Sequence, residues 1–248
     1  MVILCSCSVK ENRSVCPCEL LVRSEEALKT EGNVLVSVIQ EGEVVRQGML
    51  SREDFENGLC RLTVPRKPST VTVFSGITSM SAVEGRSLDI IRSFQCDEVY
   101  SSSVFADLQG DSYDCVILPH KNYARLFLTV IGIPESAGLR IMGPVGGYDL
   151  MSMEPNAGDF DCRPDDGGAD ASFEVRLPRQ KDDGLTLHVY YAEGSMRSVS
   201  LGPLIEASGY SFSDEDLLDI SLTVDLANSY AMVRVQDWRT EDYKIVEF

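Results

Sequence analysis

The sequence predicts an all-β protein built from β-sandwich domains, with a few short helices. Apolar and polar residues alternate along many short segments, and Gly, Pro, Asn or Asp end most of these segments. A period of two is typical of strands that bury one face, and many short strands separated by turns are typical of sandwiches. The chain has 248 residues, 44% of them apolar, which is enough for two such domains.

Strands are expected wherever this alternation is clearest, which is at residues 34–38, 71–73, 126–131, 173–177, 185–191, 199–201, 220–226 and 231–235. Within residues 185–191 we expect Leu185, Leu187, Val189 and Tyr191 to point inward, because a helical period would scatter these side chains around a surface. Glu41-Gly42 and Asn228-Ser229 have the composition of hairpin turns.

Helix signals are few and brief. Ser51 precedes Asp54 by three residues and Ser213 precedes Asp216 by three, and each pair is a variant of the capping box that begins a helix. A third short helix is expected at residues 87–94, where Leu88, Ile91 and Phe94 have helical spacing.

The domain boundary is expected near Gly110, because residues 100–114 are rich in Ser, Asp and Gly. Residues 1–12 then form a signal-peptide remnant, lipobox and linker, residues 13–110 an N-terminal sandwich, and residues 111–248 a C-terminal sandwich. No internal repeat in the sequence shows that the two halves share a fold.

The charge of the chain argues against two classes of partner. Lys and Arg number 22 against 39 Asp and Glu, a net charge of −17. Such a charge repels phosphate backbones and anionic headgroups, which excludes nucleic-acid binding and electrostatic adsorption to membranes. Every apolar run is shorter than the roughly 20 residues that a membrane-spanning helix needs.

The first seven residues resemble the end of a bacterial signal peptide. Leu4-Cys5-Ser6-Cys7 reads as a lipobox, with an aliphatic residue three positions before Cys7 and a small residue directly before it. Cys7 is therefore the expected lipid-attachment residue, whereas Cys5 would follow the bulky Leu4. Six residues are too few for a complete signal peptide, so either the start codon is assigned too late or the chain was trimmed. The alternative is that residues 1–7 form a short buried edge strand.

Three groups of motifs resemble the FimB/Mfa-type fimbrial anchor family of Bacteroidales. Residues 12–20 (NRSVCPCEL) match the family's DR-x-x-CPC-x-L opening, and residues 175–180 (VRLPRQ), followed by residues 185–187, match its PRQ strand end. The third group runs through residues 201–205, 208–212 and 216–220 to Asp225 and Trp238, in the family's order. The chain departs from the pattern at Phe212 and Phe74, where Trp is common.

The resemblance implies two tandem transthyretin-like or immunoglobulin-like β-sandwiches, an outer-membrane lipid anchor at Cys7, and a place at one end of a fimbria. It also implies a fimbrial stalk subunit as partner, bound by β-strand addition. Residues 243–248 have the length of one final strand that completes its own sandwich, so we expect an end subunit that donates no strand. The alternative is a stand-alone surface lipoprotein or fimbrial tip adhesin that binds a host protein or glycan.

No metal or other cofactor is predicted. Cys5, Cys7, Cys16 and Cys18 form C-x-C pairs, which lack the usual zinc spacing, and no pairing of the remaining cysteines into disulfides follows from their positions. The cluster Asp159, Asp161, Asp165, Asp166 and Asp170 fails the EF-hand pattern, since Arg163 takes a ligand position and Pro164 replaces the turn glycine. A solvated acidic loop is the favoured interpretation.

No catalytic residue is predicted either. His120 and His188 are the two imidazoles, one in an expected turn and the other on the outer face of an expected strand. The sequence has no G-x-S-x-G motif, and residues 143–147 (GPVGG) lack the pattern of a dinucleotide or phosphate loop. Cys16-Pro17-Cys18 lacks the C-x-x-C redox spacing. The sequence therefore favours a structural or adhesive protein over an enzyme.

Overall fold

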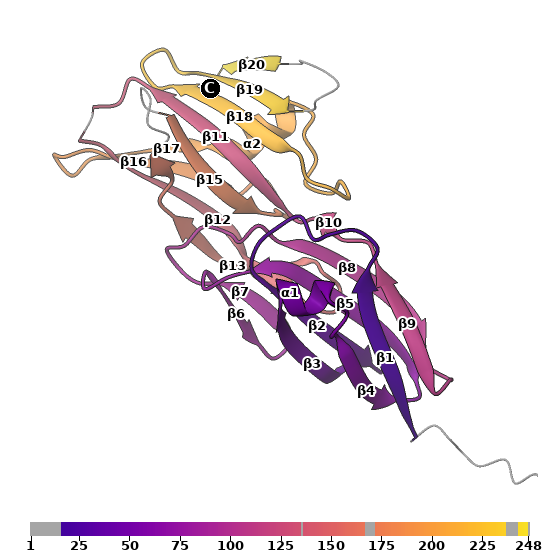
Figure 1. Ribbon diagram of the computed structural model, residues 1–248. Coiled ribbons are helices and arrows are strands. Elements are labelled where there is room, and N and C mark those ends of the chain that lie inside the picture. Colours follow the sequence, from indigo (N-terminus) through magenta and orange to yellow (C-terminus); the bar gives the residue numbers. More distant parts are fainter. Residues whose placement is uncertain (1–15, 135, 167–171, 237–242, 248) are drawn as a thin grey trace, which may run out of the picture.

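Figure 1 presents the computed structural model, which describes residues 16–134, 136–166, 172–236 and 243–247. These residues form twenty β-strands in four sheets and two short α-helices, so the all-β prediction is confirmed. Neither helix in this part of the chain is long and apolar enough to cross a membrane. The molecule is elongated, with β1 near one end and β20 at the other (Figure 1).

Two sheets form the end of the molecule that contains β1. One has the order β4-β1-β9, with β1 (Pro17–Ser24), β4 (Arg61–Pro65) and β9 (Ser112–Ile117). The other has the order β10-β8-β5-β2-β3, with β2 (Asn33–Gln40), β3 (Glu43–Ser51), β5 (Pro68–Ile77), β8 (Tyr100–Asp107) and β10 (His120–Lys121). Helix α1 (Arg52–Glu56) follows β3.

Two further sheets form the other end. One has the order β14-β15-β11-β18-β19-β20, with β11 (Tyr123–Ile131), β14 (Asp165–Asp166), β15 (Ser172–Pro178), β18 (Asp219–Asp225), β19 (Tyr230–Gln236) and β20 (Tyr243–Glu247). The other has the order β17-β16-β12-β7-β6, with β6 (Ser81–Glu84), β7 (Ser87–Ile90), β12 (Gly138–Asp149), β16 (Thr186–Tyr190) and β17 (Met196–Ser200). Strand β13 (Pro155–Cys162) also pairs with β12, and helix α2 (Leu201–Ala207) follows β17.

The same pattern of strand pairing occurs twice. In the first pairing set, β1 pairs antiparallel with β4 and parallel with β9, while β2 pairs with β3 and β5, and β5 pairs with β8. In the second pairing set, β11 pairs antiparallel with β15 and parallel with β18, while β12 pairs with β13 and β16, and β16 pairs with β17. The sequence alone does not reveal this repeat.

Each pairing set has its own apolar core, and a third cluster joins them. The first core includes Val22, Val36 and Cys115, and the second includes Leu126, Leu187 and Leu222. The third cluster contains Leu35 and Phe74 of the first set, Tyr123 and Tyr148 of the second, and Leu88 of β7. An apolar junction of this kind resists independent movement of the two ends.

Strand pairing crosses the expected domain boundary near Gly110, which lies in the turn between β8 and β9. Strand β9 follows this turn but pairs with β1, and β7 precedes it but pairs with β12. The division of the chain into domains at this point stays a prediction.

The expected strands are present, but β2 and β5 bury both faces instead of the one face that alternation predicts. Leu185, Leu187 and Val189 are fully buried, and the partly buried Tyr191 packs on the same core. Both hairpin turns are also confirmed, and in the turn between β2 and β3 both Glu41 and Gly42 have positive φ, as a primed turn requires.

One of the three expected helices is confirmed. Ser51 accepts a hydrogen bond from the backbone N–H of Asp54 and caps α1. The helix expected at Ser213 is wrong: the backbone carbonyls of Asp214 and Glu215 accept hydrogen bonds from Arg179, a distant side chain, instead of from a helical turn.

The helix expected at residues 87–94 is also wrong. Residues 87–90 form β7, because Leu88 enters the third cluster and the strand pairs with both β6 and β12. The second helix, α2, was not expected. Its Leu201, Leu204 and Ile205 are buried at helical spacing, but Gly202 and Pro203 between them are poor helix formers.

Candidate functional site

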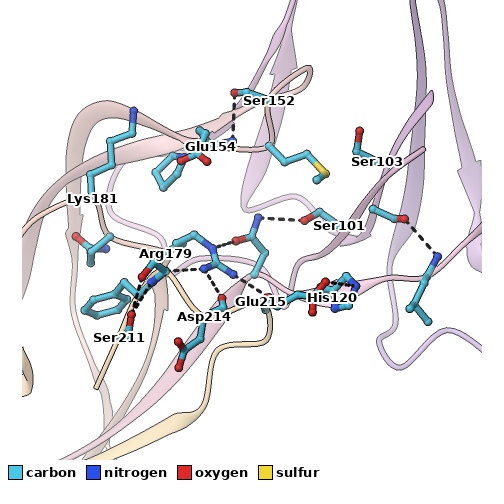
Figure 2. A pocket seen from close by; sticks show the side chains of 18 of the residues that line it. Ser101, Ser103, His120, Ser152, Glu154, Arg179, Lys181, Ser211, Asp214 and Glu215 are labelled. Atoms are coloured by element: carbon cyan, nitrogen blue, oxygen red, sulfur yellow. Dashed lines mark hydrogen bonds and ion pairs between the residues drawn. The ribbon is translucent and has the colours of Figure 1, made fainter. Parts of the chain in front are cut away.

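Two of the sequence motifs meet at the guanidinium group of Arg179. Arg179, which follows β15, donates hydrogen bonds to the backbone carbonyls of Phe212 (2.5 Å), Asp214 (2.7 Å) and Glu215 (3.1 Å). It also donates to the side-chain oxygen of Asn122. Figure 2 shows these interactions. Arg179 therefore fixes the loop of residues 212–215 against the junction of the two pairing sets.

A buried network extends from this arginine into both pairing sets. The Tyr148 hydroxyl donates to the Asn122 carbonyl at 2.6 Å and accepts from the Arg179 N–H at 3.3 Å. The Asn122 side chain donates to Ser101 of β8 at 3.2 Å. Burial raises the pKa of Tyr148 well above its usual value, so the hydroxyl stays protonated and available as a donor. The network is a polar connection between β8, β12, Asn122 just before β11 and Arg179 just after β15.

Beside this network lies an open groove of about 850 Å³. One wall comes from β8 and the region after it, through Ser101, Ser103, Val104, Val116 and Leu118. The opposite wall comes from three connecting segments of the second pairing set, residues 152–155, 179–182 and 210–215 (Figure 2). The sequence does not predict this site because its walls are far apart in the chain, although two of the motifs, at residues 175–180 and 208–212, contribute to it.

The floor of the groove carries a histidine between two acids. His120 Nε2 lies 3.1 Å from a Glu215 oxygen, and His120 Nδ1 lies 3.3 Å from an Asp216 oxygen. Partial burial alone would raise the pKa of Asp216, but hydrogen bonds from the Lys121 N–H and from His120 lower it below its usual value. Through these two contacts His120 holds the 215–216 segment in place. The expectation that His120 lies in a turn is wrong, because it lies on strand β10.

The lining is mainly polar. It includes the carboxylates of Glu154, Asp182 and Glu206 and the ammonium group of Lys181. At one side Phe212 packs edge-on against Tyr210, with ring centroids 4.9 Å apart. Phe212 therefore keeps an aromatic side chain at the position where the resembled family commonly has Trp.

The buried cysteines of the described chain are poor nucleophiles and poor metal ligands. Burial raises the pKa of Cys60 and Cys115 to about 11, and that of Cys96 and Cys162 to about 12. These thiols stay protonated at neutral pH, whereas thiolates are needed for attack or for zinc binding. Cysteines 16, 18, 60, 96, 115 and 162 are all unpaired.

The other candidate residues do not converge on one place. His188 lies on β16 between the buried Leu187 and Val189 and faces outward, as expected. Among the described residues, no three His, Cys, Asp or Glu side chains gather as metal ligands.

The expected acidic loop is in part wrong, because Asp159 and Asp161 lie on β13. Asp161 is buried, and its carboxylate accepts two 2.7 Å hydrogen bonds from Arg140, which compensate its charge. Asp165 lies on β14 and accepts from Gln95 at 2.7 Å. Cys5, Cys7, Asp170 and Trp238 lie outside the described residues.

No protein-family model matches the chain, and no curated protein matches it. Solved structures do match. The fimbrial anchor protein Mfa2 from Porphyromonas gingivalis superposes with a TM-score of 0.61 at 12% identity, over 93% of this chain and 96% of that one. The chain has the fold of a fimbrial anchor protein. The expected resemblance is therefore confirmed at the level of the fold.

Two further structures share this fold. A DUF1812 protein from Bacteroides thetaiotaomicron, named as a candidate polysaccharide-binding protein, has a TM-score of 0.65 at 12% identity, over 93% of this chain and 98% of that one. A candidate adhesin from Bacteroides ovatus has a TM-score of 0.61 at 12% identity, over 92% of this chain and 95% of that one. None of the three names describes an enzyme.

Proposed function

We propose that this protein is an outer-membrane lipoprotein that acts as a fimbrial anchor or accessory subunit in cell-surface fimbria assembly and adhesion. The observation that carries the proposal is the likeness to Mfa2, which spans 93% of this chain and 96% of the other. The motifs at residues 12–20, 175–180 and 201–220 support the same family by an independent route. Attachment to the membrane is proposed at Cys7.

In this proposal the chain consists of two tandem sandwiches of the transthyretin-like or immunoglobulin-like kind. The repeated strand pairing supports this, since β1 and β11 each have an antiparallel neighbour on one side and a parallel neighbour on the other. The separate apolar cores of the two pairing sets support it as well.

The proposed partner is a fimbrial stalk subunit, bound by β-strand addition. The proposed position is the end of the polymer. Strand β20 supports that position, because all five of its residues pair with β19 inside the same sheet. A strand that pairs within its own subunit cannot pair with a second subunit at the same time.

The proposed role is structural and adhesive, not catalytic. Both ring nitrogens of His120, which lines the groove, contact carboxylates, of Glu215 and Asp216, and not a hydroxyl that they could activate.

Anchor function is measured directly by the amounts of fimbriae on the cells and in the medium. Deleting the gene should move fimbriae from the cells to the medium, and the intact gene should restore them to the cells. Cys7→Ala should abolish labelling by a fatty-acid probe and release the protein, whereas Cys5→Ala should keep both the label and the fimbriae. Retention of fimbriae by the deletion strain would contradict the anchor proposal.

The groove favours a second candidate function, that of a stand-alone surface lipoprotein or tip adhesin for a host protein or glycan. It offers about 850 Å³, polar side chains and the aromatic ring of Phe212. Binding to an array of host glycans that is lost in Phe212→Ala and kept in Phe105→Ala, an exposed residue outside the groove lining, would favour this function over anchoring.

A further inference from the structure

The two pairing sets differ in what lies beside their last strand. In the second set, β18 pairs with β11 on one side and with β19 on the other, and the seven residues of β19 are in continuous antiparallel register. In the first set the corresponding strand β9 pairs with β1, and it lies at the edge of its sheet. Among the described strands, none pairs with β9 at the position that β19 fills in the second set.

The register of β9 shows which of its backbone groups face this edge. The Glu19 N–H donates to the Asp111 carbonyl, while Glu19 is the partner of Ser112. In a parallel ladder the next bonds then involve residues 113, 115 and 117. The N–H and C=O groups of Ser112, Asp114 and Val116 therefore point away from β1. The Leu118 N–H, next in this series, donates to Ser102 of β8, which confirms the direction.

Four of the other edge strands carry features that prevent unwanted strand pairing, and β9 carries few of them. Strand β3 has a bulge and the charges of Glu43 and Arg46, β4 has Pro65, and β10 and β14 have two residues each. Strand β9 has six residues with no proline and no bulge. Its single charge, Asp114, is neutralised by Arg23 of the neighbouring β1 through contacts of 3.0 and 3.1 Å.

Exposed apolar side chains accompany this edge. Val116 is 36% exposed, Leu118 62% and Phe105 of β8 70%. Val116 and Leu118 also line the groove, together with Val104 of β8. Exposed apolar surface beside unpaired backbone groups is the usual surface of a strand acceptor.

We propose that the outer edge of β9 is the docking site for an extended polypeptide segment of a partner subunit, which pairs with it antiparallel. The internal counterpart defines the chemistry of the occupant: β19 pairs antiparallel with β18 and buries Ala231 and Val233 in the adjoining core. The segment therefore has apolar residues at alternate positions. The identity of the partner as a fimbrial subunit rests on the proposed function. The assignment of β9 as an acceptor edge does not depend on that function.

The test uses the counterpart strand as a probe. A labelled peptide with the sequence of Tyr230–Gln236 is titrated into the folded protein, and amide hydrogen exchange locates where it binds. We expect saturable binding that protects the amides of Asp114 and Val116. Val116→Pro removes one outward N–H and should weaken binding about tenfold, because one hydrogen bond and its geometry are lost. Val116→Thr keeps the N–H and the branched side chain, and should bind as the parent does.

The outcomes separate this proposal from the anchor function. Absence of saturable binding, protection at another edge, or equal binding by the folded Val116→Pro and Val116→Thr variants would overturn the docking edge. In cells, the edge is also overturned if the parent protein retains fimbriae and Val116→Pro retains them equally. Failure of the parent protein itself to retain fimbriae would contradict the anchor function and leave the peptide result standing.

Discussion

Strands β9 and β18 hold the same place in two copies of one pairing pattern, but they differ in their surroundings. Strand β18 is flanked on both sides, and the residues that face its core are buried. Strand β9 buries Cys115 and Ile117 on its inner face but exposes Val116. The comparison teaches that this fold tolerates an open edge beside its last strand and can also close that edge with a further strand.

The largest expected effect comes from a charge placed in the covering strand. Val233 is fully buried in the second core, so Val233→Asp should lower the free energy of unfolding by about 4 kcal/mol or more. Val116→Asp, at the exposed position of β9, should change it by about 1 kcal/mol or less. Urea unfolding of both variants measures the difference. Similar losses for the two would mean that Val116 is buried as fully as Val233.

Loss of the arginine that joins the two pairing sets should have the next largest effect. Arg179→Ala leaves the carbonyls of Phe212, Asp214 and Glu215 without their donor and should cost about 2–3 kcal/mol. Arg23→Ala removes an exposed ion pair and should cost less than about 1 kcal/mol. If the two substitutions cost the same in urea unfolding, the network at Arg179 does not hold the junction.

The turn between β18 and β19 should make stability depend on acid pH. Hydrogen bonds from the Asn228 side chain, and from the backbone N–H groups of Asn228 and Ala227, lower the pKa of Asp225 below its usual value. The carboxylate therefore stabilises the fold above the pKa of the unfolded chain, about 3.9, and this contribution is lost as the pH falls through the folded pKa. Asp225→Asn should reduce the fall in urea midpoint between about pH 5 and pH 2.5. An unchanged fall would show that Asp225 does not contribute.

The smallest effect on stability is expected at the charged residue of the open edge. Asp114→Ala removes an ion pair with Arg23, whose side chains are 52% and 40% exposed, and should change the unfolding free energy by less than about 1 kcal/mol. Because Arg23 already neutralises Asp114, the variant should also have the same fraction of dimer as the parent in sedimentation experiments at equal concentration. A larger fraction of dimer in the variant would show that Asp114 protects the edge.

The sequence predicted features that depend on near neighbours. The alternation of Leu185, Leu187 and Val189 predicted a buried face, and Ser51 with Asp54 predicted α1, because each pattern acts within a few residues. Prediction failed where a distant group decides the structure. Arg179 holds residues 212–215 out of a helix, and β12 draws residues 87–90 into a sheet.

The groove and the open edge could not be predicted either, because each is formed by segments that are far apart in the sequence. Val116 alternates with Cys115 and Ile117 like a residue of any half-buried strand. The sequence does not show that β9 pairs with β1 on one side and is the last strand of its sheet. Motif resemblance brought Arg179 and Phe212 to attention without assigning them a role. Only the fold places Asn122, Arg179 and the 212–215 segment together.

The most direct test of the central comparison is residue-resolved amide hydrogen exchange in the free protein. The account predicts alternation along β9, with fast exchange at Asp114 and Val116 and slow exchange at Tyr113, Cys115 and Ile117, whose amides face β1. Along β18 it predicts uniformly slow exchange at Leu222, Thr223 and Val224, since both sides of that strand are paired. Uniformly slow exchange along β9 in the free protein would show that its outer edge is already covered and would contradict the account.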